Sequence, residues 1–148
     1  MPKTRFLGLV LGLHLALAPS FAADARPQRS APIELLGNAF RLGDLQSLRR
    51  LLGSDEKVYM ASANLGFDAG YYSADQVCLL IRGVLRDRTT LKFDFLSGPA
   101  NPSQDSPSVA VARWIYRRGN SRETTVRLSF MLVRRDGGWV LKEVRDLP

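Results

Sequence analysis

One short segment constrains the fold of this chain more than any other, the segment that runs from Tyr71 to Arg86. Ser73 and Gln76 have the spacing of a capping box, in which each side chain bonds the backbone amide of the other at a helix N-terminus. Asp75 adds a carboxylate to the first turn, where the helix dipole is positive. Apolar residues then recur at the spacing of one helical face: Val77, Leu80, Ile81, Val84 and Leu85. The pattern predicts a helix that begins after Ser73 and buries this face.

The first 22 residues have the layout of a secretory signal peptide. Lys3 and Arg5 precede an apolar run over residues 6–18, and small residues lead to Ala22. The run is shorter than the ~20 apolar residues that span a bilayer, although an uncleaved membrane anchor is the alternative.

We therefore expect cleavage after Ala22, a flexible leader over residues 23–31 and a single domain over residues 32–148. This organisation predicts a periplasmic or secreted protein. Its contact with the membrane would be made only by the signal peptide, before cleavage.

Cleavage would change the chemistry available to the mature chain. It removes His14, the only histidine, and it lowers the formal charge from +7 to +5 because Lys3 and Arg5 are lost. Histidine-dependent triads and most zinc and copper sites are then excluded, and we expect no metal and no cofactor. Cys78 is the only cysteine, and we interpret it as a small buried hydrophobe. An intermolecular disulfide is the alternative.

Helical and extended segments precede the capped helix. One helix is expected from Pro32 to Leu42, and a second from Leu45 to Leu52. Residues 57–61 favour a first strand, and a short second strand is expected around Phe67.

Alternating apolar and polar residues predict four strands after the capped helix, over residues 89–97, 109–118, 124–135 and 139–147. Glycine-containing turns are expected at residues 119–121 and 136–138.

Two of these strands have a distinctive alternation. The first places Leu91, Phe93 and Phe95 on one buried face. The alternation of the last strand slips between Leu141 and Val144, which predicts a β-bulge there.

This order of segments indicates an α+β fold, with three N-terminal helices packed on a curved antiparallel sheet of four to six strands. Three segments carry a resemblance to known proteins: Ala39 to Asp44 with the leucine-rich stretch after it, Tyr72 to Gln76, and Gly138 to Arg145. They resemble the cone-like nuclear transport factor 2-like superfamily, and within it the exported bacterial domains of unknown function. The resemblance covers nearly all of the mature chain. It implies the fold but no single activity, because the superfamily includes dehydratases, isomerases, ligand-binding domains and scaffolding domains.

Enzymes that this chain resembles commonly hold an Asp or a His inside the cone. The other carboxylates that we considered are expected in turns, at helix caps or on the outward side of a strand. Asp68 and Glu143 are then the carboxylates that are able to face a cavity. We expect no catalytic residue. The alternative is a lyase or isomerase that uses one of these carboxylates with a tyrosine.

Aromatic side chains are the candidates for a ligand pocket at the mouth of the cone: Phe40, Tyr59, Trp114 and Phe130. Such a pocket would suit an acidic or apolar small ligand. The alternative is that these rings are ordinary core residues.

Outward-facing strand residues are the candidates for a protein interface: Arg113, Ile115, Arg127 and Met131. Arginine and apolar side chains together suit a protein partner or a homodimer packed sheet on sheet, whereas a solvated basic face is the alternative. Export disfavours nucleic acid as a partner. The sequence therefore predicts an exported, non-catalytic domain that binds a protein or a small ligand.

Overall fold

The computed structural model describes residues 31–98, 106–135 and 138–148. The expected signal peptide, residues 23–30 of the expected leader and the turn positions Asp136 and Gly137 lie outside this description. The elements follow in the order α1 (Ala31–Leu42), α2 (Leu45–Arg49), β1 (Val58–Ser62), β2 (Phe67–Tyr72), α3 (Ala74–Asp87), β3 (Thr89–Ser97), β4 (Ser108–Arg117), β5 (Thr124–Arg135) and β6 (Gly138–Leu147). Within the described residues, no helix is long and apolar enough to cross a membrane.

The six strands form one sheet in the order β2-β1-β6-β5-β4-β3. Neighbouring strands are antiparallel except for β1 and β6, which run parallel, with Met60 opposite Val144. The prediction of a wholly antiparallel sheet is therefore wrong. Parallel neighbours need a long crossover connection, and here α3 and four strands lie between β1 and β6 in the chain.

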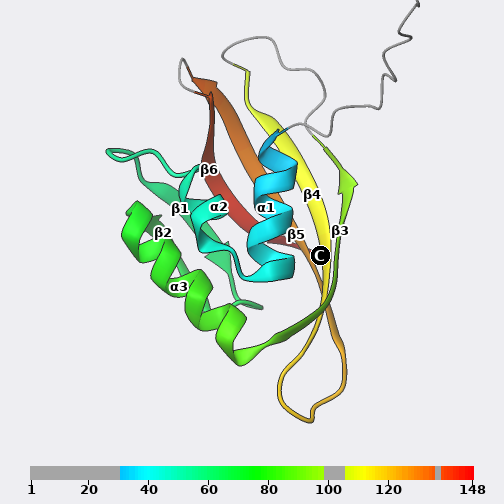
Figure 1. The fold of residues 1–148 in the computed structure, drawn as a ribbon. Helices are drawn as coiled ribbons and strands as arrows, with labels where there is room; N and C mark the ends of the chain where they lie inside the picture. The colour runs from blue at the N-terminus through cyan, green and yellow to red at the C-terminus, as the bar shows by residue number, and fades with distance from the viewer. Residues whose placement is uncertain (1–30, 99–105, 136–137) are drawn as a thin grey trace, which may run out of the picture.

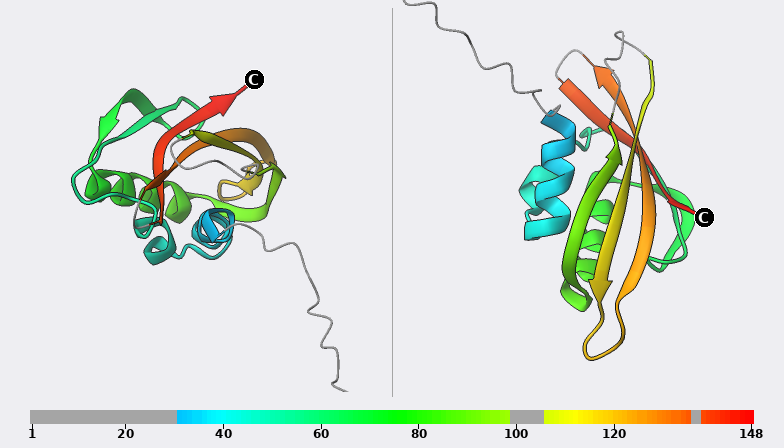
Figure 2. Two further views of the ribbon diagram at one scale, coloured as in Figure 1. Left: turned by 90° about the horizontal axis from the view of Figure 1, so that it is seen from above. Right: turned by 90° about the vertical axis from the view of Figure 1, so that its right-hand side faces the viewer.

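The sheet bends around the helices, so that its inner face is covered and its outer face is not (Figure 1, Figure 2). Each helix contributes buried residues to the core, among them Phe40 of α1, Leu48 of α2 and Ile81 of α3. The β4–β5 hairpin extends beyond the helices at one end of the molecule (Figure 1). This arrangement leaves one layer of helices on one curved sheet.

Helix α3 begins as the sequence predicts. The Ser73 hydroxyl accepts the Gln76 N–H at 3.4 Å, and the Gln76 side chain accepts the Ser73 N–H at 2.9 Å. Val77 and Ile81 of the predicted face are buried, and Cys78 is buried with them as a free thiol. The capping box thus fixes where α3 begins, and its apolar residues set the face that packs on the core.

Strand β3 departs from simple alternation near its start. The register against β4 shifts between Thr90 and Lys92, and Leu91 is the extra residue. Leu91 is therefore exposed, and the prediction that it is buried beside Phe93 is wrong. Thr90 explains the shift, because its hydroxyl donates to the Phe40 carbonyl at 2.8 Å and accepts from Trp114 Nε1 at 3.0 Å.

Strand β6 contains the predicted bulge. Met131 of β5 lies opposite Glu143, but Leu132 lies opposite Leu141, so Lys142 is the extra residue. Leu141 and Val144 consequently both point into the core. The Lys142 ammonium forms an ion pair with Glu56, which follows α2.

Helix α2 ends at Arg49, three residues before its predicted end at Leu52. The Leu51 N–H bonds the Leu48 carbonyl at 2.9 Å in a tighter turn, and the Leu51 carbonyl accepts the Leu141 N–H at 2.7 Å. The Leu52 N–H likewise bonds the Arg49 carbonyl, three residues earlier, so the α-helical bonding ends in this tighter turn. Leu51 and Leu52 are still buried.

Candidate functional site

The predicted pocket residues Phe40, Trp114 and Phe130 meet inside the cone. The Phe40 ring stacks on Phe93 at 4.7 Å and meets Trp114 and Phe130 edge to face at 5.4 and 5.7 Å. None of these four side chains is more than 2% exposed. The rings fill the interior that a pocket at these positions would occupy, and they form part of the core.

The fourth predicted pocket residue, Tyr59, lies away from these rings. Val58, Met60 and Ser62 are the buried residues of β1, so Tyr59 points to the outer face of the sheet. Its ring contacts Tyr71 at 5.2 Å, and the Arg145 guanidinium lies 4.9 Å from its centre. Glu143 accepts a hydrogen bond from Arg145 and thereby raises the pKa of Arg145. Tyr59 thus belongs to an outer cluster of aromatic and charged groups.

The carboxylate candidates do not enter the cone. Asp68 is exposed on β2, and Glu143 is on the outer face, bonded to Arg145 at 3.0 Å. Asp146, which the sequence did not single out, holds β6 to the β1–β2 turn by accepting from the Ser62 hydroxyl and from the Asn64 N–H. In the part of the chain that the structure describes, the buried polar and charged residues are Ser47, Ser62, Arg88 and Ser108. The described residues contain no group of His, Cys, Asp and Glu able to hold a metal ion.

The predicted interface residues all lie on the outer face of β4 and β5. Arg113 is opposite Arg127, while Ile115 and Met131 lie further along the same two strands. Arg113 bonds Asp94 of β3 at 3.1 Å. Hydrogen bonds from Lys92 and then Arg113 lower the pKa of Asp94.

Apolar side chains lie among these charges. Val109 of β4 is 50% exposed, and Val111, Ile115 and Met131 are partly exposed. Arg127 donates to a backbone oxygen of Pro148 at 3.2 Å and forms no ion pair with a side-chain carboxylate of the described residues. We call the outward side chains of β4, β5 and β6 the outer sheet face.

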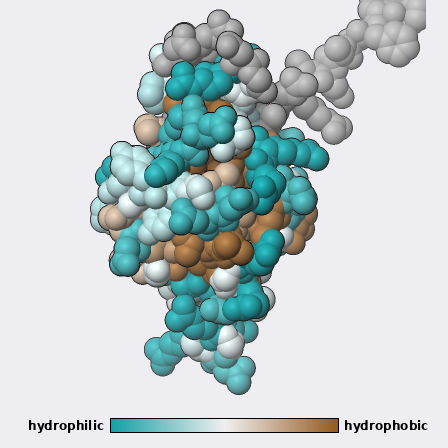
Figure 3. Space-filling view, turned by 90° about the vertical axis from the view of Figure 1, so that its left-hand side faces the viewer, coloured by the Kyte–Doolittle hydropathy of each residue, from teal (hydrophilic) through white to brown (hydrophobic). Residues whose placement is uncertain are grey.

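A second apolar area lies on the side of the molecule that carries α3 and β2, and apolar side chains gather there (Figure 3). Leu79 is 61% exposed, and Tyr72, Gln76 and Leu80 line a shallow hollow with it. Exposed leucines of this kind are common on protein surfaces, so this area supports no assignment by itself.

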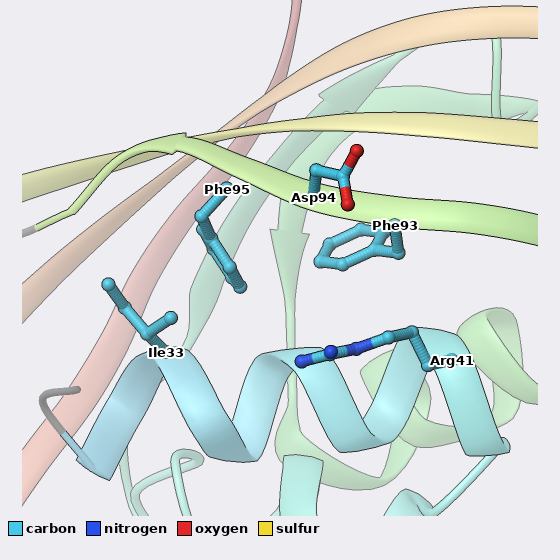
Figure 4. A pocket seen from close by; sticks show the side chains of 5 residues that line it. All are labelled: Ile33, Arg41, Phe93, Asp94 and Phe95. Atoms are coloured by element: carbon cyan, nitrogen blue, oxygen red, sulfur yellow. The ribbon is translucent and has the colours of Figure 1, made fainter.

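A groove of about 200 Å³ lies between α1 and β3 (Figure 4). Its lining consists of Ile33, Arg41, Phe93, Asp94 and Phe95. Arg41 extends back along α1, above the helix and below β3 (Figure 4). Its Nε donates to the Gly37 carbonyl at 3.2 Å, and a Cβ added at position 37 would overlap the Arg41 guanidinium. The small residue at position 37 therefore lets a cation lie in this groove.

Arg41 also lines a neighbouring cleft of about 290 Å³, together with Arg88. Arg88 follows α3 directly, and its guanidinium lies 5.2 Å from the centre of the Tyr116 ring. A basic residue directly after a helix, as Arg88 is, suits the negative C-terminal end of the helix dipole. In the sequence, Arg88 lies between the apolar face of α3 and the inward residue Thr90. This position is the signal that could have predicted that Arg88 is buried.

Helices on the inner face of a curved six-stranded sheet define the class: the chain has the nuclear transport factor 2-like fold that the sequence resembles. Solved structures with this fold are similar to it. A DUF4783 family protein from Bacteroides uniformis superposes with a TM-score of 0.60 at 15% identity, over 76% of this chain and 93% of that one. An NTF-2 like protein of unknown function from Shewanella oneidensis superposes with a TM-score of 0.56 at 16% identity, over 78% of this chain and 95% of that one.

A third similar structure is a hypothetical protein from Catenulispora acidiphila with a ketosteroid isomerase-like fold, in complex with trimethylamine. It gives a TM-score of 0.59 at 9% identity, over 79% of this chain and 84% of that one. No protein-family model and no curated protein matches the chain. At these identities the similarity defines the fold alone.

Proposed function

We propose that this chain is an exported, non-catalytic binding domain that recruits a protein with an acidic surface through its outer sheet face. The observation that carries the proposal is the contrast between the two sides of the sheet. The inner side is filled by packed rings, whereas the outer side leaves apolar side chains partly exposed among arginines. This mixture is typical of protein interfaces, where arginine and aromatic residues are enriched.

The charges of the outer sheet face favour an acidic partner. Arg113 and Arg145 are each bonded to one carboxylate, and Arg127 has only a backbone oxygen as its partner among the described residues. A guanidinium carries five N–H donors, so these contacts leave donors for a partner. Arg127 is the strongest candidate for an anchor, because it would exchange water and one backbone oxygen for a partner carboxylate.

Charge also argues against a second copy of the chain as the partner. After the expected cleavage the chain carries a formal charge of +5, which opposes the approach of two copies. An acidic protein would be attracted by the same field, and its binding would weaken with salt.

The experiment compares two double variants of the mature chain, residues 23–148. Arg113→Glu/Arg127→Glu reverses the charge of the outer sheet face, and Arg82→Glu/Arg86→Glu makes the same change on the exposed side of α3. A photo-cross-linker at Ile115 is used to capture a partner from the envelope fraction of the source cells, and the purified partner is then titrated.

We expect the first double variant to weaken binding at least tenfold and the second to leave it within about twofold. Equal binding by both variants would refute the outer sheet face as the site. A dimer in sedimentation that only the first variant dissociates would instead identify a second copy as the partner. Export is tested separately, as described in the Discussion.

A further inference from the structure

The loop that joins β4 to β5 lies at the end of a hairpin that extends beyond the helices (Figure 1, Figure 2). Tyr116 and Thr124 are the last residues that β4 and β5 pair with each other, so residues 117–123 form the loop. We call these residues the hairpin tip. All of them are exposed, and none carries an apolar side chain. The hairpin tip therefore contributes nothing to the core.

The hairpin tip is strongly basic. Three arginines, Arg117, Arg118 and Arg122, and one carboxylate, Glu123, give it a formal charge of +2. Arg117 donates to Glu123 at 3.1 Å. Arg118 and Arg122 form no ion pair with a carboxylate of the described residues. Two of the three guanidinium groups are thus available to an anion from outside the chain.

The turn itself is held by contacts that do not use the arginine side chains. The Ser121 N–H donates to the Arg118 carbonyl at 3.0 Å, and the Ser121 hydroxyl donates to the same carbonyl at 2.6 Å. Gly119 has a φ of 52°, in the left-handed region that favours glycine. Two-residue turns are enough to join antiparallel strands. Neither the length of this loop nor its arginines are therefore needed to close the hairpin.

The hairpin tip also contains a hollow of about 430 Å³, which is lined by Arg117, Asn120, Ser121, Arg122 and Glu123. A guanidinium presents parallel N–H donors whose spacing matches two oxygens of a phosphate group. Glu123 is already paired with Arg117, whereas Arg122 has no carboxylate partner among the described residues. The hollow therefore suits a phosphate group that Arg122 binds.

The shape of the hairpin tip indicates which phosphate compound it meets. It has no aromatic side chain on which a base could stack, as proteins that bind single-stranded nucleic acids have. Because it projects from one end of the molecule, it can contact a flat surface without obstruction by the helices (Figure 2). Such a surface is a bilayer with anionic head groups, to which each nearby arginine contributes about fivefold in binding.

We propose that the hairpin tip docks the domain on the surface of a bilayer that contains anionic phospholipid, where Arg118 and Arg122 bind the phosphates of the head groups. Without apolar side chains the tip stays at the level of the head groups, so the contact is reversible and depends on salt. This proposal goes beyond the expectation that only the signal peptide contacts the membrane, because a contact through charges needs no apolar segment. It does not rest on the proposed protein interaction.

The test measures how the mature chain, residues 23–148, partitions onto vesicles in co-sedimentation. Vesicles of phosphatidylglycerol and phosphatidylcholine in equal parts are compared with vesicles of phosphatidylcholine alone. We expect binding to the first only, with broadening of the amide signals of Gly119, Asn120 and Ser121 in the ¹⁵N-labelled chain. Raising the salt from about 0.1 M to about 0.5 M should abolish this binding. Equal binding to both vesicles, or binding that survives the higher salt, would overturn the proposal.

Variants assign the binding to the hairpin tip. Arg118→Gln/Arg122→Gln removes two charges from the tip, and Arg134→Gln/Arg135→Gln removes two exposed charges at the other end of β5, about 30 Å along the strand. We expect the first variant to weaken binding to the anionic vesicles about 30-fold. The second should weaken it less than about threefold, because about 10 Å of salt solution already screens a charge.

Two outcomes would refute the hairpin tip as a membrane-docking site. An equal loss in both variants would mean that the net charge of the chain alone causes the binding. Displacement of the chain from the vesicles by millimolar inorganic phosphate, beyond that caused by sodium chloride at the same ionic strength, would identify a site for free phosphate instead.

Discussion

Phe40→Ala is the perturbation that most directly tests whether the cone is closed. Phe40 is 2% exposed and lies at the centre of the ring cluster, stacked on Phe93 and edge to face with Trp114 and Phe130. Truncation removes all three ring contacts at once and leaves a cavity between α1 and the sheet. Leu42→Ala, on the same helix but 75% exposed, is the matched control.

The expected loss of stability follows from these contacts. Truncation of a phenylalanine in a core to alanine lowers the free energy of unfolding by about 3–5 kcal/mol. Three ring pairs, each contributing about 0.5–1.5 kcal/mol beyond buried area, place this site in the upper part of that range, at about 4.5 kcal/mol. Leu42→Ala should change the free energy of unfolding by no more than about 0.5 kcal/mol.

Urea unfolding of the mature chain, followed by far-UV circular dichroism, measures both changes. With a slope of about 1.5 kcal/mol per M, Phe40→Ala should lower the midpoint by about 3 M, and Leu42→Ala by less than about 0.4 M. A loss below about 1.5 kcal/mol for Phe40→Ala (roughly the cost of a much smaller truncation) would refute the reasoning. It would mean that the rings do not pack as a core, and a ligand pocket inside the cone would become the better interpretation.

Further predictions concern caps, polar contacts, pH and export. Ser73→Ala should cost about 1 kcal/mol in the same urea assay, because it removes the hydroxyl that caps α3. Thr90→Val should cost about 1–3 kcal/mol, because it leaves two buried polar partners unpaired, whereas Thr90→Ser should retain most of the stability. The Lys142 ammonium lowers the pKa of Glu56 below its ordinary value of 4.5, so this pair contributes stability above about pH 4.5 that is lost as the pH falls through the lowered pKa. Glu56→Gln should therefore make the unfolding midpoint less sensitive to pH below about 4.5. N-terminal sequencing of the protein from the envelope or the medium should give Ala23 as the first residue, and Met1 would contradict the proposed export.

Local signals in the sequence predicted the local structure well. The capping box at Ser73 and the bulge between Leu141 and Val144 are both present, because each depends on residues only a few positions apart. The buried residues of β4 also follow from alternation alone, as do those of β5 except Val133, which is buried next to Leu132. Where a structural feature is determined within one segment, the sequence is sufficient.

Contacts between distant segments explain the failures. Leu91 alternates correctly with Phe93, yet Thr90 takes the inward position because Phe40 and Trp114 offer it hydrogen bonds. The parallel pairing of β1 with β6 has no local signature at all. It depends on the crossover that the whole chain makes between these strands.

The candidate site was predicted only in part, because it too depends on contacts between distant segments. Phe40, Trp114 and Phe130 do meet, but whether four rings leave a cavity depends on how tightly they pack, which alternation does not show. Tyr59 lies on the other side of the sheet, since Val58 and Met60 take the buried positions of β1. The burial of Arg88 was not predicted, because a basic residue after a helix is usually solvated.

The position of β6 in the sheet has a consequence for how the chain is made. β6 is the strand that joins the β1–β2 hairpin to the β3–β5 meander, yet among the six described strands it is the last in sequence. While the chain is being synthesised, α1, α2, β1 and β2 have emerged long before their partner strand exists. The complete sheet can form only when residues 138–147 are available, so the sheet cannot close until these residues have been synthesised. A chain with this strand order would remain open during synthesis, which is the state in which a polypeptide can still be threaded through a narrow channel.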